Sequence, residues 1–246
     1  MTSEAWTEAW TRTRLRIVSC GGGGAGGSEP TPGLRILLLH GLGQDAASFR
    51  EATTAMRAAA PEGSEFTLCQ APHDAVALSM MLASGGSGGS GGRGLQWWNM
   101  SPSSLGSGWA HSLDHLVKIL ELTGPFDGIV GFSQGAAALA MLVAEARLSQ
   151  RRWFRFACFV GGFLPNAPHL RERIDKAVAG GGLFALPTWH CYGSDDFVIP
   201  SEKSQALASC FKDAVFAPHN GAHVVPRGNV LKGFGSFLEL QKERLS

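Results

Sequence analysis

Ser133 lies between two glycines, Gly131 and Gly135, at a point where the residue pattern changes. An apolar, strand-like run, Ile129 to Phe132, precedes it, and a helical pattern, Ala136 to Arg147, follows it. This order is typical of a nucleophile elbow, a turn so tight that glycine is favoured two residues before and two after the nucleophile. The pattern predicts that Ser133 is the nucleophile of an acyl-transfer reaction.

A serine hydroxyl needs a base to take its proton and a third group to orient that base. Two later loops supply candidates: Asp195 and Asp196 follow one strand-like segment, and His219 and His223 follow the next. Serine, then acid, then histidine is the chain order of α/β-hydrolases. The local sequence favours neither aspartate and neither histidine strongly, so both choices stay open at this point.

The elements that must position these residues alternate between strand and helix. Strands are expected over 35–39, 66–70, 129–132, 154–161, 188–192 and 214–217, and helices over 46–60, 109–122, 136–147, 201–211 and 229–242. This alternation predicts an α/β fold with a mostly parallel sheet and helices on both faces. In such a fold the loops at the carboxyl ends of the strands face the active site.

One of those loops is glycine-rich and comes directly after the first strand, from His40 to Gln44. Glycine there lets backbone amides approach a ligand closely. We assign the amide of Leu42, together with that of Gln134 at the start of the helix, to an oxyanion hole. The competing interpretation of His40 and Gly41 is a plain tight turn.

Composition limits which other partners and locations are expected. The 246 residues carry a formal net charge of +1 without runs of like charge, which predicts neither a nucleic-acid partner nor a stable membrane anchor. The five cysteines show no metal-type spacing, and the start of the chain lacks an apolar leader pattern, so reduced thiols and a cytoplasmic, possibly also nuclear, location are expected.

Two glycine-rich tracts interrupt the pattern. We expect residues 1–33 to form a flexible extension that ends in a Gly-rich linker, and residues 34–246 to form the hydrolase-type domain. A Gly/Ser insertion over 84–94 is expected to be disordered.

The insertion is followed by an aromatic pair, Trp97 and Trp98. These side chains either form a wall for an acyl chain or anchor a loop in the core. In the first case Trp97, Trp98, Phe163 and Val198 would line the substrate pocket. No cofactor is expected. His111 and His115 have a metal-compatible spacing, but no third ligand is evident, and a solvated helix face explains them better.

Three segments together resemble the family of FSH-type serine hydrolases: residues 124–137 around the serine, 38–44 upstream, and 219–226 downstream. The resemblance covers about residues 34–240. It implies an α/β-hydrolase fold and hydrolysis of small-molecule carboxylic esters or thioesters of acyl chains without a cofactor. Carried over by motif, it implies a triad of Ser133, Asp196 and His223, and it includes the paired tryptophans.

Two other functions compete with a serine carboxylesterase or thioesterase of this family. An enzyme similar to acyl-protein thioesterases would share the Gly-Phe-Ser-Gln-Gly segment, but the ending at His219 to Pro226 speaks against it. A ligand-binding protein that keeps the hydrolase fold without turnover would show no ester hydrolysis. The sequence names neither the acyl chain nor the oligomeric state.

Overall fold

The computed structural model describes residues 33–75 and 94–245, and these ranges contain a six-stranded sheet in which every pair of neighbouring strands is parallel. Its order is β2 (Glu65–Cys69), β1 (Arg35–Leu39), β5 (Gly128–Phe132), β6 (Phe156–Val160), β7 (Thr188–Gly193) and β8 (Ala214–His219). The predicted α/β class and parallel sheet are therefore confirmed.

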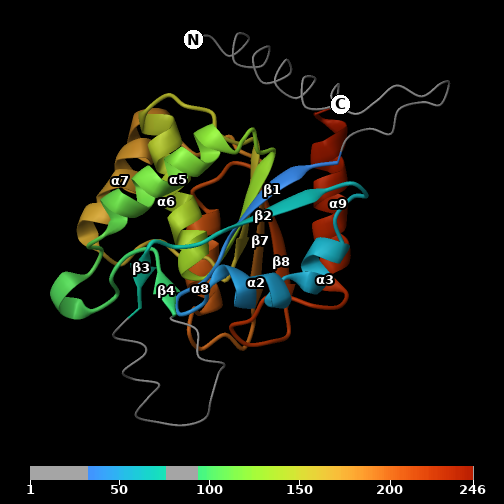
Figure 1. Ribbon diagram of the computed structural model, residues 1–246, viewed down its shortest axis with the longest axis horizontal. Helices are drawn as coiled ribbons and strands as arrows, with labels where there is room; N and C mark the ends of the chain where they lie inside the picture. The colour runs from blue at the N-terminus through green and yellow to red at the C-terminus, as the bar shows by residue number, and fades with distance from the viewer. Residues whose placement is uncertain (1–32, 76–93, 246) are drawn as a thin grey trace.

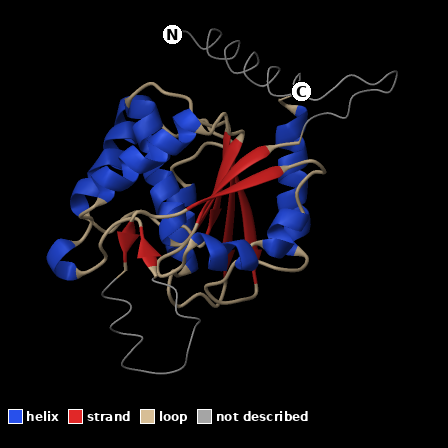
Figure 2. Cartoon of the chain, viewed as in Figure 1, coloured by secondary structure: helices blue, strands red, loops and turns tan. Residues whose placement is uncertain are grey.

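Helices cover both faces of this sheet (Figures 1 and 2). One layer contains α5 (Trp109–Leu122), α6 (Gln134–Leu148), α7 (Pro168–Gly181) and α8 (Ser201–Ala208). The other contains α2 (Ala46–Ala52), α3 (Thr54–Ala58) and α9 (Val230–Glu243). The side chains of β1 alternate between the layers: Leu37 packs into the first and Leu38 into the second. A strand buried on both faces is apolar along its length, as β5 and β6 are throughout and β1 is from Ile36 to Leu39.

Helix α6 is the centre of the first layer. Its residues from Gln134 to Glu145 are all buried, between β5 and α7. A series of alanines lets its backbone approach these neighbours closely, and the Glu145 carboxylate accepts a hydrogen bond from Arg173 Nε of α7 (2.7 Å). The helix that follows Ser133 is therefore held rigidly.

Three local predictions differ from the structure. The helix expected over 46–60 is two helices, broken at Thr53, whose hydroxyl donates to the Phe49 carbonyl (2.7 Å). Helix α7 was not expected, although Leu170, Ile174 and Ala177 have helical spacing and are buried. A small antiparallel hairpin, β3 (His73–Asp74) with β4 (Leu95–Gln96), lies where no regular element was expected, together with the 3-10 turn η1 (Pro102–Ser104).

The predicted extension lies outside the described residues except for Gly33, and the Gly/Ser insertion does so except for Gly94. Cys69, Cys158, Cys191 and Cys210 are free thiols. Within the described ranges, no helix is long and apolar enough to span a lipid bilayer.

Candidate active site

Ser133 occupies the turn between β5 and α6 with φ 53° and ψ −119°. A positive φ with this ψ is rare for a residue with a side chain. A Cβ at Gly131 would lie 2.5 Å from the Gly135 carbonyl oxygen, and one at Gly135 would lie 2.3 Å from the Leu39 oxygen. Both glycines are therefore required by close backbone approach, which is the reason for the pattern seen in the sequence.

The loop after β8 brings His223 to this turn. Ser133 Oγ lies 2.8 Å from His223 Nε2, and His223 Nδ1 lies 2.6 Å from Asp196 Oδ2. The imidazole stacks on the Phe132 ring, with centroids 4.9 Å apart. When Nδ1–H donates to the carboxylate, Nε2 is left as an acceptor for the serine proton.

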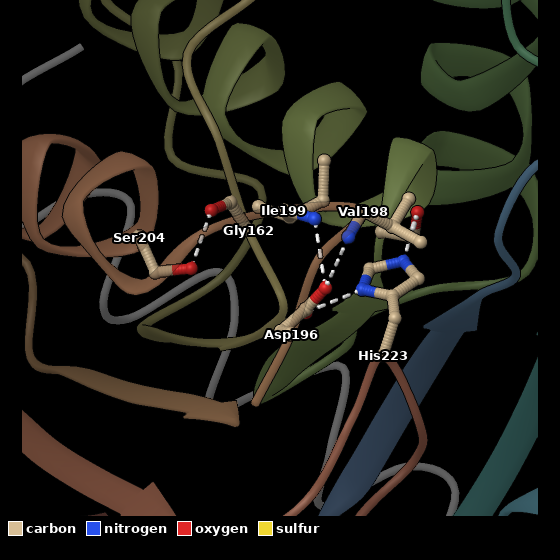
Figure 3. A network of polar contacts seen from close by, with 7 residues as sticks. Gly162, Asp196, Val198, Ile199, Ser204 and His223 are labelled. Atoms are coloured by element: carbon tan, nitrogen blue, oxygen red, sulfur yellow. Dashed lines mark hydrogen bonds and ion pairs between the residues drawn. The ribbon is translucent and has the colours of Figure 1, made fainter. Parts of the chain in front are cut away.

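Asp196 follows β7 and is buried, with 1% of its side chain exposed. Its Oδ1 accepts hydrogen bonds from the amides of Val198 (2.9 Å) and Ile199 (2.7 Å), while Oδ2 faces His223 (Figure 3). Both oxygens are therefore satisfied, as a buried carboxylate requires. These contacts fix the carboxylate against the imidazole.

The other candidates of each pair lie elsewhere. Asp195 is exposed, and its amide donates to the Gly221 carbonyl (3.1 Å). His219 ends β8, half-buried, and partial burial lowers the pKa of its imidazole. The structure thus brings together Ser133, Asp196 and His223 and leaves Asp195 and His219 outside the hydrogen-bonded chain.

The glycine-rich loop after β1 lies against the serine, because a Cβ at Gly41 would be 3.2 Å from the Cβ of Ser133. The loop is closed by the Gln44 side chain, which accepts from the Gly41 amide (2.9 Å). Its far end pairs with the hairpin: Gly43 N donates to Leu95 O (2.8 Å), and Leu95 N donates to Gln44 O (3.1 Å). Leu42 and Gln134 therefore stand on two segments that flank Ser133.

Both segments are also bonded to the tryptophan pair. The Gln134 side chain accepts from the Trp97 amide and donates to the Trp98 carbonyl, both at 2.9 Å. The Trp97 indole donates to the His40 carbonyl (2.8 Å), directly before the glycine-rich loop. Residues 95–98 thus form a brace, as we call it below, that connects the start of α6 to residues 40–44.

His40 adds a further fixed contact to this brace. The Ala71 amide donates to its Nε2 (3.0 Å), so its proton lies on Nδ1, which is 2.8 Å from the Gly41 carbonyl. The ring is fully buried, and burial lowers its pKa, which keeps it neutral. From the sequence, Gln134 was assigned only a role for its backbone amide, and His40 only a place before a glycine-rich turn. The hydrogen-bond partners of their side chains lie far along the chain, so no local pattern reveals them.

The four residues expected to line a substrate pocket differ in their exposure to solvent. Trp97 and Trp98 are 0% and 1% exposed, Phe163 is buried, and Val198 is 64% exposed beside Asp196. A cavity of about 990 Å³ lies next to His223 and Phe132, bounded by residues 218–221 and 223–227 and by the start of α9. The structure places the aromatic pair in the hydrophobic core.

Among the described residues, no group of three or more His, Cys, Asp and Glu side chains is placed to hold a metal ion. His111 contacts the ring of His73 edge to face, and His115 Nε2 lies 3.0 Å from the Gln70 carbonyl oxygen.

A parallel sheet between two helical layers, with a strained serine between its central strand and the helix that follows, defines an α/β-hydrolase fold. Comparison with known proteins gives the family. Residues 31–233 match the family model described as "Serine hydrolase (FSH1)". The chain belongs to this family of serine hydrolases.

Its relatives are named as esterases. "Esterase OVCA2" of Bos taurus is 34% identical over 210 residues, which cover 79% of this chain and 90% of the relative. The protein of the same name from Danio rerio is 35% identical over 215 residues, covering 78% and 90%. Among solved structures, acyl-protein thioesterase 2 of Zea mays superimposes with a TM-score of 0.62 at 21% identity, covering 88% of this chain and 97% of that one.

Proposed function

We propose that this protein hydrolyses carboxylic esters or thioesters of acyl chains through a covalent acyl-enzyme on Ser133. The observation that carries the proposal is the chain of hydrogen bonds from Ser133 Oγ through His223 to Asp196. It supplies a nucleophile, a base with the correct tautomer, and a carboxylate that orients the base. The esterase names of the relatives support the same reaction class.

In the first step Ser133 Oγ attacks the acyl carbonyl while His223 Nε2 takes the serine proton. Asp196 stabilises the imidazolium that forms. The amides of Leu42 and Gln134 are our candidates for binding the oxyanion, since they lie on the two segments that flank the serine. His223 then donates its proton to the leaving alcohol or thiol, and the C–O or C–S bond breaks.

In the second step a water molecule attacks the acyl-serine ester. His223 removes the proton of the water and returns it to Ser133 Oγ as the acid product leaves. The brace keeps the glycine-rich loop and the start of α6 in place through both steps. The amides on these segments can then stabilise the oxyanion without first having to reorganise.

The proposal is tested with p-nitrophenyl esters of graded chain length and the matching acyl thioesters. We expect hydrolysis by the natural protein and a loss on the order of 10³-fold or more in Ser133→Ala, because the nucleophile is removed. Ser209→Ala, at the exposed end of α8, is the control and should keep full activity. A folded natural protein that hydrolyses no ester or thioester of any length would refute the proposal and favour a ligand-binding protein.

A further inference from the structure

The cavity beside His223 is lined mostly by residues that the hydrolytic mechanism does not use. It is walled by the loop after β8, by part of the glycine-rich loop and α2, and by the beginning of α9. Its lining residues are Gln44, Ala52, Phe132, Pro218, His219, Asn220, Gly221, His223, Val224, Val225, Pro226, Arg227, Asn229 and Val230. The wall is continuous with the catalytic site because His223 and Phe132 belong to both.

The permanent charge of this lining is positive. Arg227 is its one permanently charged residue, and no carboxylate lines the cavity in the described part of the chain. Arg227 forms no ion pair with a described residue. The first turn of α9 behind it contains Lys232 and no acidic residue. Because Arg227 is exposed, lines the cavity and meets no carboxylate there, its guanidinium is available to bind an external anion.

Arginine suits carboxylate and phosphate oxygens because its planar guanidinium donates two parallel hydrogen bonds to them. The cavity also borders the reacting centre, since its wall includes His223, which protonates the leaving group as it departs. The volume of about 990 Å³ is at the upper end of ordinary small-molecule sites, so a substrate part larger than a simple alcohol fits.

We propose that this cavity binds an anionic group, a phosphate or carboxylate, carried by the ester or thioester substrate, and that Arg227 is the residue that recognises it. The inference rests on the proposed function, because it assigns a substrate class to the same site. The anion can be part of the leaving group, as in a phosphorylated thiol, or stand at the far end of the acyl chain.

Two matched substrate pairs distinguish an anion in the leaving group from an anion at the far end of the acyl chain. For the leaving group, hexanoyl-coenzyme A is compared with S-hexanoyl-N-acetylcysteamine, which is uncharged. For the acyl chain, the mono-p-nitrophenyl ester of adipic acid is compared with p-nitrophenyl hexanoate. In each pair kcat/KM is measured for the natural protein and the variants, and the ratio of the anionic to the neutral substrate is the readout, so that any general effect of a substitution cancels.

The variants are Arg227→Ala, Arg227→Lys and Arg227→Glu. We expect the ratio of at least one pair to fall about three- to tenfold in Arg227→Ala, as for a partly exposed charge-assisted contact, and further in Arg227→Glu. Arg227→Lys should retain most of the ratio, because it keeps the charge. Raising the salt concentration should lower the ratio of the natural protein, since an exposed ion pair is screened.

Arg244→Glu is the matched control. It changes another exposed arginine at the other end of α9, about 20 Å away for a helix of 14 residues. It should leave both ratios unchanged.

Ratios that stay constant in Arg227→Glu while the neutral substrates are hydrolysed would overturn the anion site and leave the proposed function intact. A folded natural protein that hydrolyses none of these four substrates and no ester or thioester of the graded series would overturn both.

Discussion

At the scale of single residues, the two adjacent aspartates have opposite environments. Asp196 is buried and uses both carboxylate oxygens, one for His223 and one for two backbone amides. Asp195 is exposed, and its hydrogen bonds go to Gly221 and Ser194. The proposed mechanism therefore requires the carboxylate of Asp196 alone.

Replacing each aspartate by asparagine separates their roles. In Asp196→Asn the new amide group would face His223 Nδ1 as a donor, which puts the imidazole proton on Nε2, where it blocks proton transfer from Ser133. We expect kcat/KM to fall on the order of 10³- to 10⁴-fold, as in serine proteases with this change. Asp195→Asn should stay within about twofold, as is usual for exposed positions. Comparable losses in the two variants would refute the assignment.

At this scale, the local sequence identified the nucleophile but not the acid and the base that act with it. Two glycines around Ser133 have a local cause, the close backbone approach at the turn, and this cause is visible in the order of residues. Which aspartate meets which histidine depends on how the ends of β7 and β8 lie beside each other. Local sequence does not encode that, so the pair rested on family resemblance.

At the scale of elements, the brace is the feature that sequence patterns could not reveal. Its residues 95–98 belong to a two-residue strand and a bend, and their bonds reach Gln134 and His40, which are distant in the chain. Elements with a clear apolar pattern, such as β1, α5 and α9, were located almost to the residue. The helix expected over 46–60 was less well predicted: it is divided at Thr53, whose hydroxyl bonds to the Phe49 carbonyl, and no break is visible in the apolar pattern.

Trp97→Phe tests whether the brace supports turnover. The change removes the indole hydrogen bond and leaves the buried His40 carbonyl without it, next to the glycine-rich loop. We expect kcat for a p-nitrophenyl ester to fall about tenfold, because small displacements of catalytic groups are costly.

Trp189→Phe is the control for this variant. Trp189 is equally buried, but its indole nitrogen has no hydrogen-bond partner among the described residues. The Trp189→Phe variant should keep the kcat of the natural protein even if its midpoint of urea unfolding falls as far as that of Trp97→Phe. Equal kcat values in the two variants would argue against a positioning role for the brace.

At the scale of the whole molecule, the sheet separates two hydrophobic clusters that together bury both faces. The alternation of strands and helices was sufficient to predict this architecture, because a parallel sheet requires a crossover between successive strands. The first cluster also encloses a polar group. His190 of β7 is 1% exposed, stacks on Phe159 at 4.7 Å, and has its Nε2 3.0 Å from the Thr188 hydroxyl.

This buried histidine makes stability depend on pH. Burial lowers the pKa of His190 from the ordinary 6.5 to about 3. Between these values the unfolded chain binds a proton that the folded chain excludes, so the free energy of unfolding should fall as pH drops below 6.5. For one proton the slope approaches about 1.4 kcal/mol per pH unit.

The measurement is urea unfolding at pH 7 and pH 5. His190→Phe should lose less stability between the two values than the natural protein does, because the neutral ring cannot take up a proton. His169→Phe, on the exposed side of α7, should keep the natural pH dependence. An unchanged pH dependence in His190→Phe would show that other groups govern acid sensitivity.

The most direct test of the central claim is labelling with a fluorophosphonate probe, followed by mass spectrometry of the peptides. Such a probe forms a covalent bond with a serine only when a base activates its hydroxyl. Our account predicts one adduct, on Ser133, in the natural protein and none in a folded Ser133→Ala variant. An unlabelled natural protein, or equal labelling of Ser133→Ala, would contradict it.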